Sequence, residues 1–405
     1  MSISPAEKSD LLRLSATVSQ IGASATLAAS EKARQLRAQG IDVLDLGPGQ
    51  PDFDTPESIR NAGIQAIRDG RTRYTPAAGI PELREAVANL YTSREGVSYE
   101  TDETMIAAGG KQALHNFFMS VLDPGDEVIV PTPYWVSIPE QVKLAGGRPV
   151  TVDTDEADGF ELRAETIATA CTGRTRVIVL NTPSNPSGAV IGGDEMRKLA
   201  ELALERGILL LVDECYATLV YEGAEHVTPL CVGDQAKDVT VMCGSCSKSY
   251  AMTGWRIGYL AGPREIIGAC VRLQGHTTSN PASVSQYAAL EAMIGDQAPV
   301  RDMLATFAER RDRVLPRIRA LPGVECVEPK GAFYAFPNVS ALFSEQYPSS
   351  AELAGYFIDH AHVVTVPGVA FGRDGFLRMS YATSMETLER SLDRLETACS
   401  ALVAG

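Results

Sequence analysis

Between about positions 80 and 290, short runs of apolar residues alternate with longer segments whose apolar residues recur every three or four positions. The runs predict strands at TRVIVLN, ILLLVDE, DVTVMCG and RIGYLAG, and the longer segments predict helices such as GDEMRKLAELALERG and REIIGACVRLQG. Apolar strands separated by amphipathic helices are typical of a mostly parallel sheet covered on both faces. Sheets of this kind bind ligands at the carboxyl ends of their strands.

The pattern changes after about residue 290. A long helix, VRDMLATFAERRDRVLPRIRAL, is followed by short strands at GAFYAFP, VVTVPG and FLRMSYA. A terminal helix comes last, and Thr383 to Glu386 match a capping box at its start. We therefore expect an α/β protein with a large domain at 50–290. A smaller α+β domain would combine the N-terminal segment 1–49 with 291–405.

Composition narrows the choice of partner and location. The 405 residues are 45% hydrophobic and 21% charged, which is ordinary for a globular protein. A formal charge of −15 without a stripe of Lys and Arg argues against nucleic acid or an anionic membrane as a partner. No apolar run reaches transmembrane length, and the first 25 residues do not resemble a signal peptide. We expect a cytoplasmic protein whose eight cysteines are free thiols.

A C-x-x-C pair, Cys243 and Cys246, raises the question of a metal. A zinc site needs a second pair or a group of histidines at ligand spacing, whereas His360 and His362 lie far along the chain. Free thiols within apolar strands are ordinarily buried packing residues. The sequence therefore predicts no metal site.

One lysine, Lys248, follows an apolar strand among hydroxyl-bearing and small residues in GSCSKSYAMTGWRIG. Earlier, a helix begins directly after two glycines, so free N–H groups and the helix dipole could bind a phosphate there, although an ordinary turn would look the same. Dinucleotide and P-loop motifs are absent. The candidate phosphate ligands are Gly110, Lys111 and Gln112 at the turn, with Ser245, Ser247 and Arg256 around the lysine.

Asp213 ends a buried strand, where a carboxylate costs several kcal/mol unless donors or a cation compensate it. It either caps the next turn or pairs with a protonated ring nitrogen. Tyr216 could reach the same ligand, Asn185 follows another strand end in either a turn or a ligand role, and Trp135 could stack on a ring. An amine, phosphate ligands, a carboxylate and an aromatic side chain together are the requirements for pyridoxal 5′-phosphate.

The residues named above occur within longer segments that form a family pattern. The segments include GPGQPDFDTPE, AAGGKQAL, NTPSNPSGAV, VDECYATLVY, SKSYAMTGWRIGYLAGP and LRMSYATS, and the similarity runs from about residue 24 to the C-terminus, nearly the whole chain. The chain resembles the fold-type I, class I pyridoxal-phosphate-dependent aminotransferases. It is most similar to the bacterial subgroup of aspartate and aspartate/prephenate aminotransferases.

This resemblance implies a role for each residue. Lys248 would form the Schiff base with the cofactor and then act as general acid and base. Asp213 would keep the ring nitrogen protonated, Asn185 and Tyr216 would donate to the ring's phenolic oxygen, and Trp135 would stack on the ring. The phosphate would be surrounded by Gly110, Lys111, Gln112, Ser245, Ser247 and Arg256.

The resemblance also implies a homodimer with active sites at the subunit interface, because Tyr74 would reach the phosphate of the partner subunit. Arg378 would bind the substrate α-carboxylate beside Gly49, with Trp135 and Asn185 also near the substrate. The implied reaction is ping-pong transfer of an amino group between an L-amino acid and a 2-oxo acid. Aspartate, glutamate and aromatic or prephenate-like compounds are the expected substrates.

One departure from the pattern leaves the substrate open. Gly275 stands where the best-known aspartate branch carries an arginine for the distal carboxylate. The bacterial subgroup also lacks this arginine, and Ser24, Thr26 and Lys111 stand in the stretches it uses instead, so Lys111 serves either phosphate or substrate. Other fold-type I enzymes (a lyase, a synthase or an oxidase-like enzyme) share the same Lys, Asp and Arg. A cofactor-binding sensor is disfavoured, since this acidic chain offers no DNA-binding region.

Overall fold

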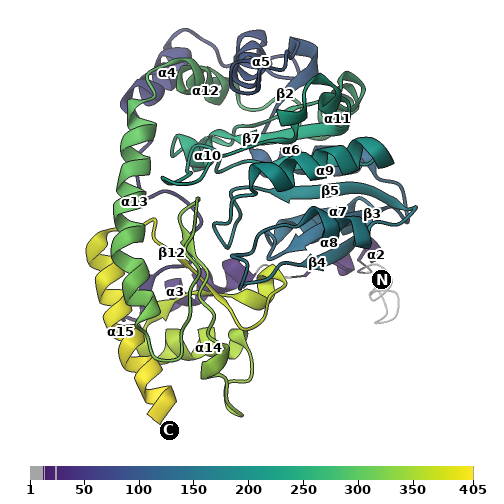
Figure 1. Cartoon of the computed structure of the whole chain (residues 1–405). Coiled ribbons are helices and arrows are strands. Elements are labelled where there is room, and N and C mark those ends of the chain that lie inside the picture. Colours follow the sequence, from purple (N-terminus) through teal and green to yellow (C-terminus); the bar gives the residue numbers. More distant parts are fainter. Residues whose placement is uncertain (1–11, 13, 23–24, 405) are drawn as a thin grey trace, which may run out of the picture.

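The computed structural model describes residues 12, 14–22 and 25–404, and the side chains of these except 25–30 (Figure 1). Its largest sheet has seven strands in the order β2-β8-β7-β6-β5-β3-β4. Neighbouring strands are parallel except where β8 pairs with β2 and β7. The strands are β2 (Thr104–Ala107), β3 (Glu127–Thr132), β4 (Arg148–Asp153), β5 (Thr175–Asn181), β6 (Leu209–Asp213), β7 (Thr240–Ser245) and β8 (Gly258–Ala261). The prediction of a mostly parallel sheet is confirmed.

The connection between β7 and β8 explains why β8 is reversed. It contains only the short helix α10 (Cys246–Ser249) and a 3₁₀ turn (Thr253–Trp255), neither of which can return along the sheet. A parallel pairing needs a connection long enough to return to the other end of the sheet. The β7–β8 connection is too short for this, so the chain turns back and β8 runs antiparallel to β7. Lys248 and Arg256 both lie on this connection, at the end of the sheet where β7 finishes.

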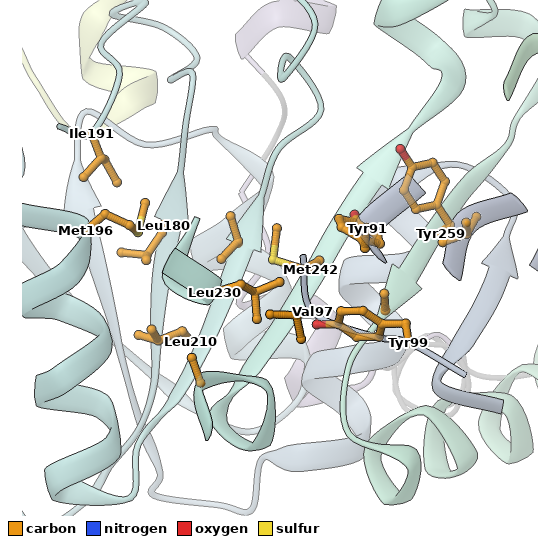
Figure 2. Packing of buried hydrophobic residues seen from close by; sticks show 14 of the residues in the cluster. Tyr91, Val97, Tyr99, Leu180, Ile191, Met196, Leu210, Leu230, Met242 and Tyr259 are labelled. Carbon is orange, nitrogen blue, oxygen red and sulfur yellow. The ribbon is translucent and has the colours of Figure 1, made fainter. Parts of the chain in front are cut away.

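Two hydrophobic cores cover the two faces of the large sheet. Alternate residues of one strand enter different cores: Val179 packs with α6, α7 and α11, whereas Leu180 packs with α5, α8, α9 and α12. Figure 2 shows Leu180, Leu210 and Met242 of adjacent strands in the second core. This double burial explains the continuous apolar runs. The helices are α5 (Pro81–Glu95), α6 (Gly110–Val121), α7 (Ser137–Leu144), α8 (Ala164–Ala170), α9 (Gly193–Arg206), α11 (Arg264–Thr277) and α12 (Ser283–Ile294).

A third core is built mainly from the C-terminal part of the chain. The long helix α13 runs down one side of the molecule from α4 and α12 to α15 (Figure 1). A three-stranded antiparallel sheet has the order β11-β12-β9, and β1 pairs with β10. The elements are α2 (Ala16–Ser19), α3 (Ala25–Ala38), β1 (Leu44–Asp45), α4 (Glu57–Arg68), α13 (Ala298–Arg319), β9 (Tyr334–Ala335), α14 (Ser350–Tyr356), β10 (Val363–Val364), β11 (Val366–Pro367), β12 (Leu377–Ser380) and α15 (Met385–Ala404). The domain boundaries at 50 and 290 stay a prediction.

Two local predictions were wrong. The segment VVTVPG forms two strands instead of one, because β1 is the partner of its first half and β12 the partner of its second half. The cap of α15 lies one residue later than predicted. Ser384 Oγ accepts the N–H of Thr387 at 3.2 Å, so Ser384 takes the role assigned to Thr383.

Cysteines and possible membrane segments also bear on the sequence predictions. Within the described ranges, all eight cysteines are free, and no group of three or more His, Cys, Asp or Glu side chains could hold a metal ion. Cys243 and Cys246 are both fully buried. No helix in this part of the chain is long and apolar enough to cross a membrane.

Candidate active site

A cleft of about 920 Å³ lies where β5, β6 and β7 end, between the large sheet and the small one. Asp213 and Ser245 are the last residues of their strands, and Tyr334 of β9 and Arg378 of β12 line the opposite side. The structure brings twelve of the predicted site residues into this lining: Gly49, Gly110, Lys111, Trp135, Asn185, Asp213, Tyr216, Ser245, Ser247, Lys248, Arg256 and Arg378.

Lys248 lies on α10 with its amine inside the cleft. The amine donates a hydrogen bond to the carbonyl of Gly49, which brings the N-terminal segment to the end of β7. Burial lowers the pKa of Lys248 to about 8, and the positive charges of Arg378 and Arg256 act in the same direction. A substantial fraction of the amine is therefore neutral near pH 8.

Asp213 is 4% exposed, and burial raises the pKa of its carboxyl. The carboxylate accepts the backbone N–H of Cys215 at 3.3 Å. None of the described lysines, arginines or histidines lies within ion-pair distance of it. A buried carboxylate that faces a cleft and is not paired with a cation is suited to bind a positively charged group of a ligand.

The N-terminus of α6 forms the other end of the cleft, and glycines make it accessible. A Cβ at Gly109 would collide with the Arg256 guanidinium, and one at Gly258 would collide with the backbone of Gly110. Gly109 also has a φ of +91°, which disfavours other residues. These close approaches place Arg256, which forms no ion pair within the described residues, beside free helix N–H groups. The arrangement suits an anion such as a phosphate.

Two serines complete this end of the cleft. Ser245 caps α10 by accepting the N–H of Ser247 at 3.1 Å, and the two hydroxyls lie 2.9 Å apart. Both residues are buried. The same cap that begins α10 therefore orients two hydroxyls and, one residue later, Lys248.

Arg378 is only 3% exposed. Its Nη1 donates to Asn185 Oδ1 at 3.0 Å and its Nη2 to the carbonyl of Gly47 at 2.6 Å, whereas its Nε has no partner. The guanidinium also lies 4.5 Å from the centre of the Tyr334 ring. Over the described ranges Arg378 contacts no carboxylate, so this buried cation is suited to receive one from a ligand.

Trp135 and Lys111 line the wall near α7. The Lys111 amine lies 5.0 Å from the centre of the Trp135 ring, and burial together with the charge of Arg256 lowers the pKa of Lys111. On the facing side, the hydroxyls of Tyr216 and Tyr334 are 2.9 Å apart. Tyr334 was not predicted as a site residue. Its only signal was its place in the strand GAFYAFP, because its neighbours in the cleft come from distant segments.

Two predicted residues lie outside the cleft lining. The Gln112 side chain hydrogen-bonds to the N–H of Ala108 and to the hydroxyl of Thr278 instead, because it points toward α11. Tyr74 is 91% exposed, so it does not reach the cleft of its own chain.

The residues considered for the substrate side chain are placed only in part. Gly275 lies exposed on α11 and does not line the cleft. Ser24 lies outside the described residues, as does the side chain of Thr26. Of the residues considered there, Lys111 is the one that the structure places in the cleft.

Comparison with known proteins agrees over nearly the whole chain. A model of the aminotransferase class I and II family matches residues 41–395. The chain is 44% identical to an aspartate aminotransferase of Geobacillus stearothermophilus, over 95% of this chain and 98% of the relative. It is also 44% identical to a probable aspartate/prephenate aminotransferase of Aquifex aeolicus, with the same shares covered.

Solved structures show the same similarity. The aspartate aminotransferase of Rhizobium meliloti superimposes with a TM-score of 0.92 at 41% identity, over 96% of this chain and 99% of that one. The Thermus thermophilus aspartate aminotransferase with maleate has a TM-score of 0.91 at 42% identity, over 95% and 99%. The chain therefore belongs to the class I and II aminotransferase family, and it is an aminotransferase with the fold-type I architecture.

Proposed function

We propose that the cleft binds pyridoxal 5′-phosphate and transfers an amino group between an L-amino acid and a 2-oxo acid in a ping-pong reaction. The observation that supports this most directly is the set of charges in the cleft. An amine with a lowered pKa lies near a buried carboxylate and two guanidiniums, and none of the last three has an oppositely charged partner within the described residues. When bound, pyridoxal phosphate supplies an aldehyde and a ring that accepts electrons from a breaking substrate bond.

The residues present fit this cofactor. Arg256, Ser245, Ser247 and the first N–H groups of α6 would hold the phosphate, in the space that the glycines keep open. Asp213 would hold a proton on the ring nitrogen. A face of Trp135 would cover the ring, and Asn185 and Tyr216 would donate hydrogen bonds to its phenolic oxygen. Gln112 would contribute little, since its side chain points away.

Lys248 and Arg378 would carry out the substrate chemistry. Arg378 binds the α-carboxylate in a fork and so orients the Cα–H bond. Lys248 would remove the Cα proton and deliver it to the carbon that was the cofactor's aldehyde, which requires a neutral amine. A pKa near 8 provides that base close to physiological pH while leaving it able to give the proton back.

The substrates we propose are dicarboxylic amino acids, with aspartate and glutamate first and a prephenate-like oxo acid as an acceptor. The relatives support this, since two are named aspartate and probable aspartate/prephenate aminotransferases. Lys111 supports it physically, because its amine lies at the Trp135 wall of the cleft and could bind a distal carboxylate. We therefore assign Lys111 to the substrate and not to the phosphate.

We further propose a homodimer in which the partner subunit's Tyr74 completes each phosphate site. Tyr74 is 91% exposed in the single chain, although a tyrosine normally buries most of its ring. Other large apolar side chains are exposed on α4 and α12, which pack together: Ile64, Ile67 and Ile294. A second copy of this chain would cover such a surface.

Half-reactions of the purified enzyme test the proposal. Loaded with pyridoxal phosphate, the enzyme should lose its visible absorbance when aspartate or glutamate is added alone, with one equivalent of oxo acid released. Addition of 2-oxoglutarate, oxaloacetate or prephenate should restore the absorbance. Release of ammonia without recovery would instead indicate a lyase.

The attachment site has its own control. Lys248→Ala should abolish borohydride-reducible attachment of pyridoxal phosphate, whereas Lys198→Ala, at an exposed lysine paired with Glu195 on α9, should not change it. Attachment to another lysine in the Lys248→Ala protein, located by peptide mapping, would overturn the assignment.

A further inference from the structure

Tyr334 is fully buried on β9, yet it lines the cleft between two residues with proposed roles. Its ring faces the Arg378 guanidinium and its hydroxyl lies 2.9 Å from that of Tyr216. β9 and β12 are adjacent antiparallel strands, which brings Tyr334 and Arg378 to the same side of the small sheet. One side chain therefore contacts both the proposed substrate anchor and a proposed donor to the cofactor.

The ring of Tyr334 helps to hold Arg378 in place. The guanidinium carbon lies 4.5 Å from the centre of the Tyr334 ring and 5.1 Å from that of Phe371. Among the residues that the structure describes, two hydrogen bonds, to Asn185 and to Gly47, supplement these contacts, and Nε has no partner there. A desolvated cation gains appreciably from an aromatic face. The two rings thus keep the guanidinium oriented before a substrate carboxylate arrives.

The hydroxyl of Tyr334 decides where the proton of Tyr216 points. Only one hydroxyl of such a pair can donate to the other. Burial raises the pKa of both phenols and the charge of Arg378 opposes this at both, but it is the Tyr334 ring that the guanidinium contacts, and Tyr334 raises the pKa of Tyr216 further. Either hydroxyl can donate across this contact, and the cation against its ring makes Tyr334 the better donor, so in the arrangement that we infer Tyr334 donates to Tyr216. The proton of Tyr216 is then free to point into the cleft.

The backbone at Gly49 fixes the position of the Tyr334 hydroxyl. A Cβ at Gly49 would lie 2.9 Å from that hydroxyl and 4.0 Å from Arg378 Nη1. The carbonyl of Gly49 accepts the Lys248 amine. The glycine predicted to leave room beside Arg378 therefore leaves it chiefly for Tyr334, and the tyrosine is held from three sides.

We propose that Tyr334 is a positioning residue with two separable actions: its ring orients Arg378 toward the substrate carboxylate, and its hydroxyl directs the proton of Tyr216 into the cleft. The inference rests on the roles proposed above for Arg378 and Tyr216. Because ring and hydroxyl act on different partners, two substitutions at one position should give different results.

Tyr334→Phe keeps the ring and removes the hydroxyl. The dissociation constant for maleate, a dicarboxylate without an amino group, should stay within about twofold of the wild-type value. The pH midpoint of the visible absorbance change of the loaded enzyme should rise by as much as about one unit, since a misdirected Tyr216 donates less to the ring oxygen. An unchanged midpoint would show that the hydroxyl does not direct Tyr216.

Tyr334→Met removes the ring and keeps a large apolar side chain. If the methionine variant does not fold, Tyr334→Leu serves as the ring-deleted variant. Either should weaken maleate binding about tenfold and also raise the midpoint. Equal maleate affinity in the phenylalanine variant and in the ring-deleted variant would overturn the role of the ring. Wild-type enzyme that neither binds pyridoxal phosphate nor loses absorbance with aspartate would refute the proposed function instead.

The chain contains a matched control outside the cleft. Tyr221 and Tyr381 form a second buried pair with hydroxyls 3.0 Å apart, and Arg311 lies 4.4 Å from the centre of the Tyr221 ring. Tyr221→Phe thus removes the same kind of hydroxyl beneath an arginine. It should lower the melting temperature at least as much as Tyr334→Phe does, because the Tyr221 hydroxyl also donates to the carbonyl of Ala332, and it should leave maleate affinity and the pH midpoint unchanged. Equal shifts in both variants would mean that general loosening, and not Tyr334, moves the midpoint.

Discussion

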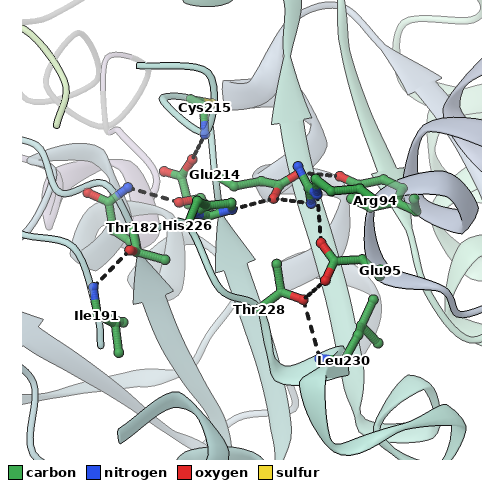
Figure 3. Close-up of polar contacts among 12 residues, drawn as sticks. Arg94, Glu95, Thr182, Ile191, Glu214, Cys215, His226, Thr228 and Leu230 are labelled. Carbon is green, nitrogen blue, oxygen red and sulfur yellow. Dashed lines mark hydrogen bonds and ion pairs between the residues drawn. The ribbon is translucent and has the colours of Figure 1, made fainter. Parts of the chain in front are cut away.

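Two neighbouring carboxylates, Asp213 as the last residue of β6 and Glu214 directly after it, lie in opposite surroundings. Glu214 accepts the Tyr91 hydroxyl and Arg94 Nη2, each at 2.6 Å, and lies 2.9 Å from His226 Nε2 (Figure 3). Asp213 accepts the backbone N–H of Cys215, and none of the cations in the described part of the chain lies within ion-pair distance of it. Burial alone would raise the pKa of both, but Arg94 and His226 hold the pKa of Glu214 at about 2, while that of Asp213 stays raised.

Successive side chains of a strand point to opposite sides, so one carboxylate faces the protein interior and the other the cleft. The interior carboxylate is fully satisfied by the protein. In the described part of the chain, the Asp213 carboxylate and Arg378 have no oppositely charged partner, whereas Arg94 is paired with both Glu214 and Glu95. Incomplete charges are costly to bury, and a ligand that completes them recovers that cost as binding free energy. The difference between the two residues is thus a difference between holding the fold and holding a ligand.

The largest effect should come from Asp213→Asn. The half-reaction with aspartate should slow by about 10²–10³-fold, because an amide cannot hold a proton on the ring nitrogen. The cofactor-free protein should become more stable in urea. Because burial raises the pKa of Asp213 above its unfolded value, its ionisation destabilises the folded state as pH rises through this range. The substitution removes that ionisation and its cost. Apoprotein that lost stability would show that Asp213 is already satisfied.

Glu214→Gln should show the reverse. Loss of the charge leaves Arg94 and His226 without their main partner, so the free energy of unfolding should fall by about 3 kcal/mol at pH 7. The pKa of Glu214 is below its unfolded value, so its contribution is full above about pH 4.5 and disappears as pH falls toward 2. Urea midpoints of variant and wild type should therefore converge in acid.

A control for Glu214→Gln is Glu389→Gln, which removes an exposed carboxylate paired with Arg313. It should cost less than about 1 kcal/mol at any pH. Equal losses in the two variants would mean that the buried pairing gives no special stability. If Glu214→Gln slowed the half-reaction as much as Asp213→Asn does, the two carboxylates would not have separate roles.

Sequence reasoning could locate the strand ends but could not distinguish these two residues by physics. Both are acids at the end of an apolar run; the strand end made Asp213 a candidate, and the resemblance decided between a turn cap and a ligand role for it. Two of the partners of Glu214, Tyr91 and Arg94, lie more than 100 positions earlier, and no local pattern shows such contacts. Local signals were enough to predict the helices and strands of the large sheet, whereas several residues that line the cleft, such as Asn181, Cys215 and Tyr334, were not predicted as site residues.

What could not be predicted depended on long-range packing. The direction of the Gln112 side chain follows from Thr278, directly after α11, and the division of VVTVPG follows from which strands are available to pair. Tyr334 gained its place in the cleft from Arg378, Tyr216 and Gly49, which come from three separate segments. The cap at Ser384 instead of Thr383 shows the ordinary one-residue uncertainty of helix starts.

Lys248, which lies in the cleft with Asp213, gives a prediction of pH dependence. Attachment of pyridoxal phosphate to Lys248 needs the neutral amine, whose pKa is about 8 in the fold. Its rate in the apoprotein should fall about tenfold per pH unit below 8 and level off above it. A lysine model compound, with a pKa near 10.4, should still be gaining rate at pH 9–10. Borohydride trapping at timed intervals measures both, and identical profiles would contradict the effect of burial.

The smallest effect should come from a side chain beside both carboxylates that serves neither. Cys243 lies opposite Asp213 in the register of β6 and β7, fully buried, and its thiol points to the carbonyl of Gly110 at 3.8 Å. Asp213 and Glu214 both add to the burial that keeps its pKa well above the usual value, so it stays an uncharged packing group.

Cys243→Ala should therefore leave the half-reaction rate within about twofold and cost about 1 kcal/mol of stability from the lost sulfur. Cys270→Ala, at another buried thiol of the same core on α11, should do the same. If Cys243→Ala alone slowed the reaction tenfold while both variants lost equal stability, the thiol would be acting on Asp213. In that case the Cys243 thiol would stabilise the Asp213 carboxylate, and Asp213 and Glu214 would differ only in how strongly the protein stabilises them.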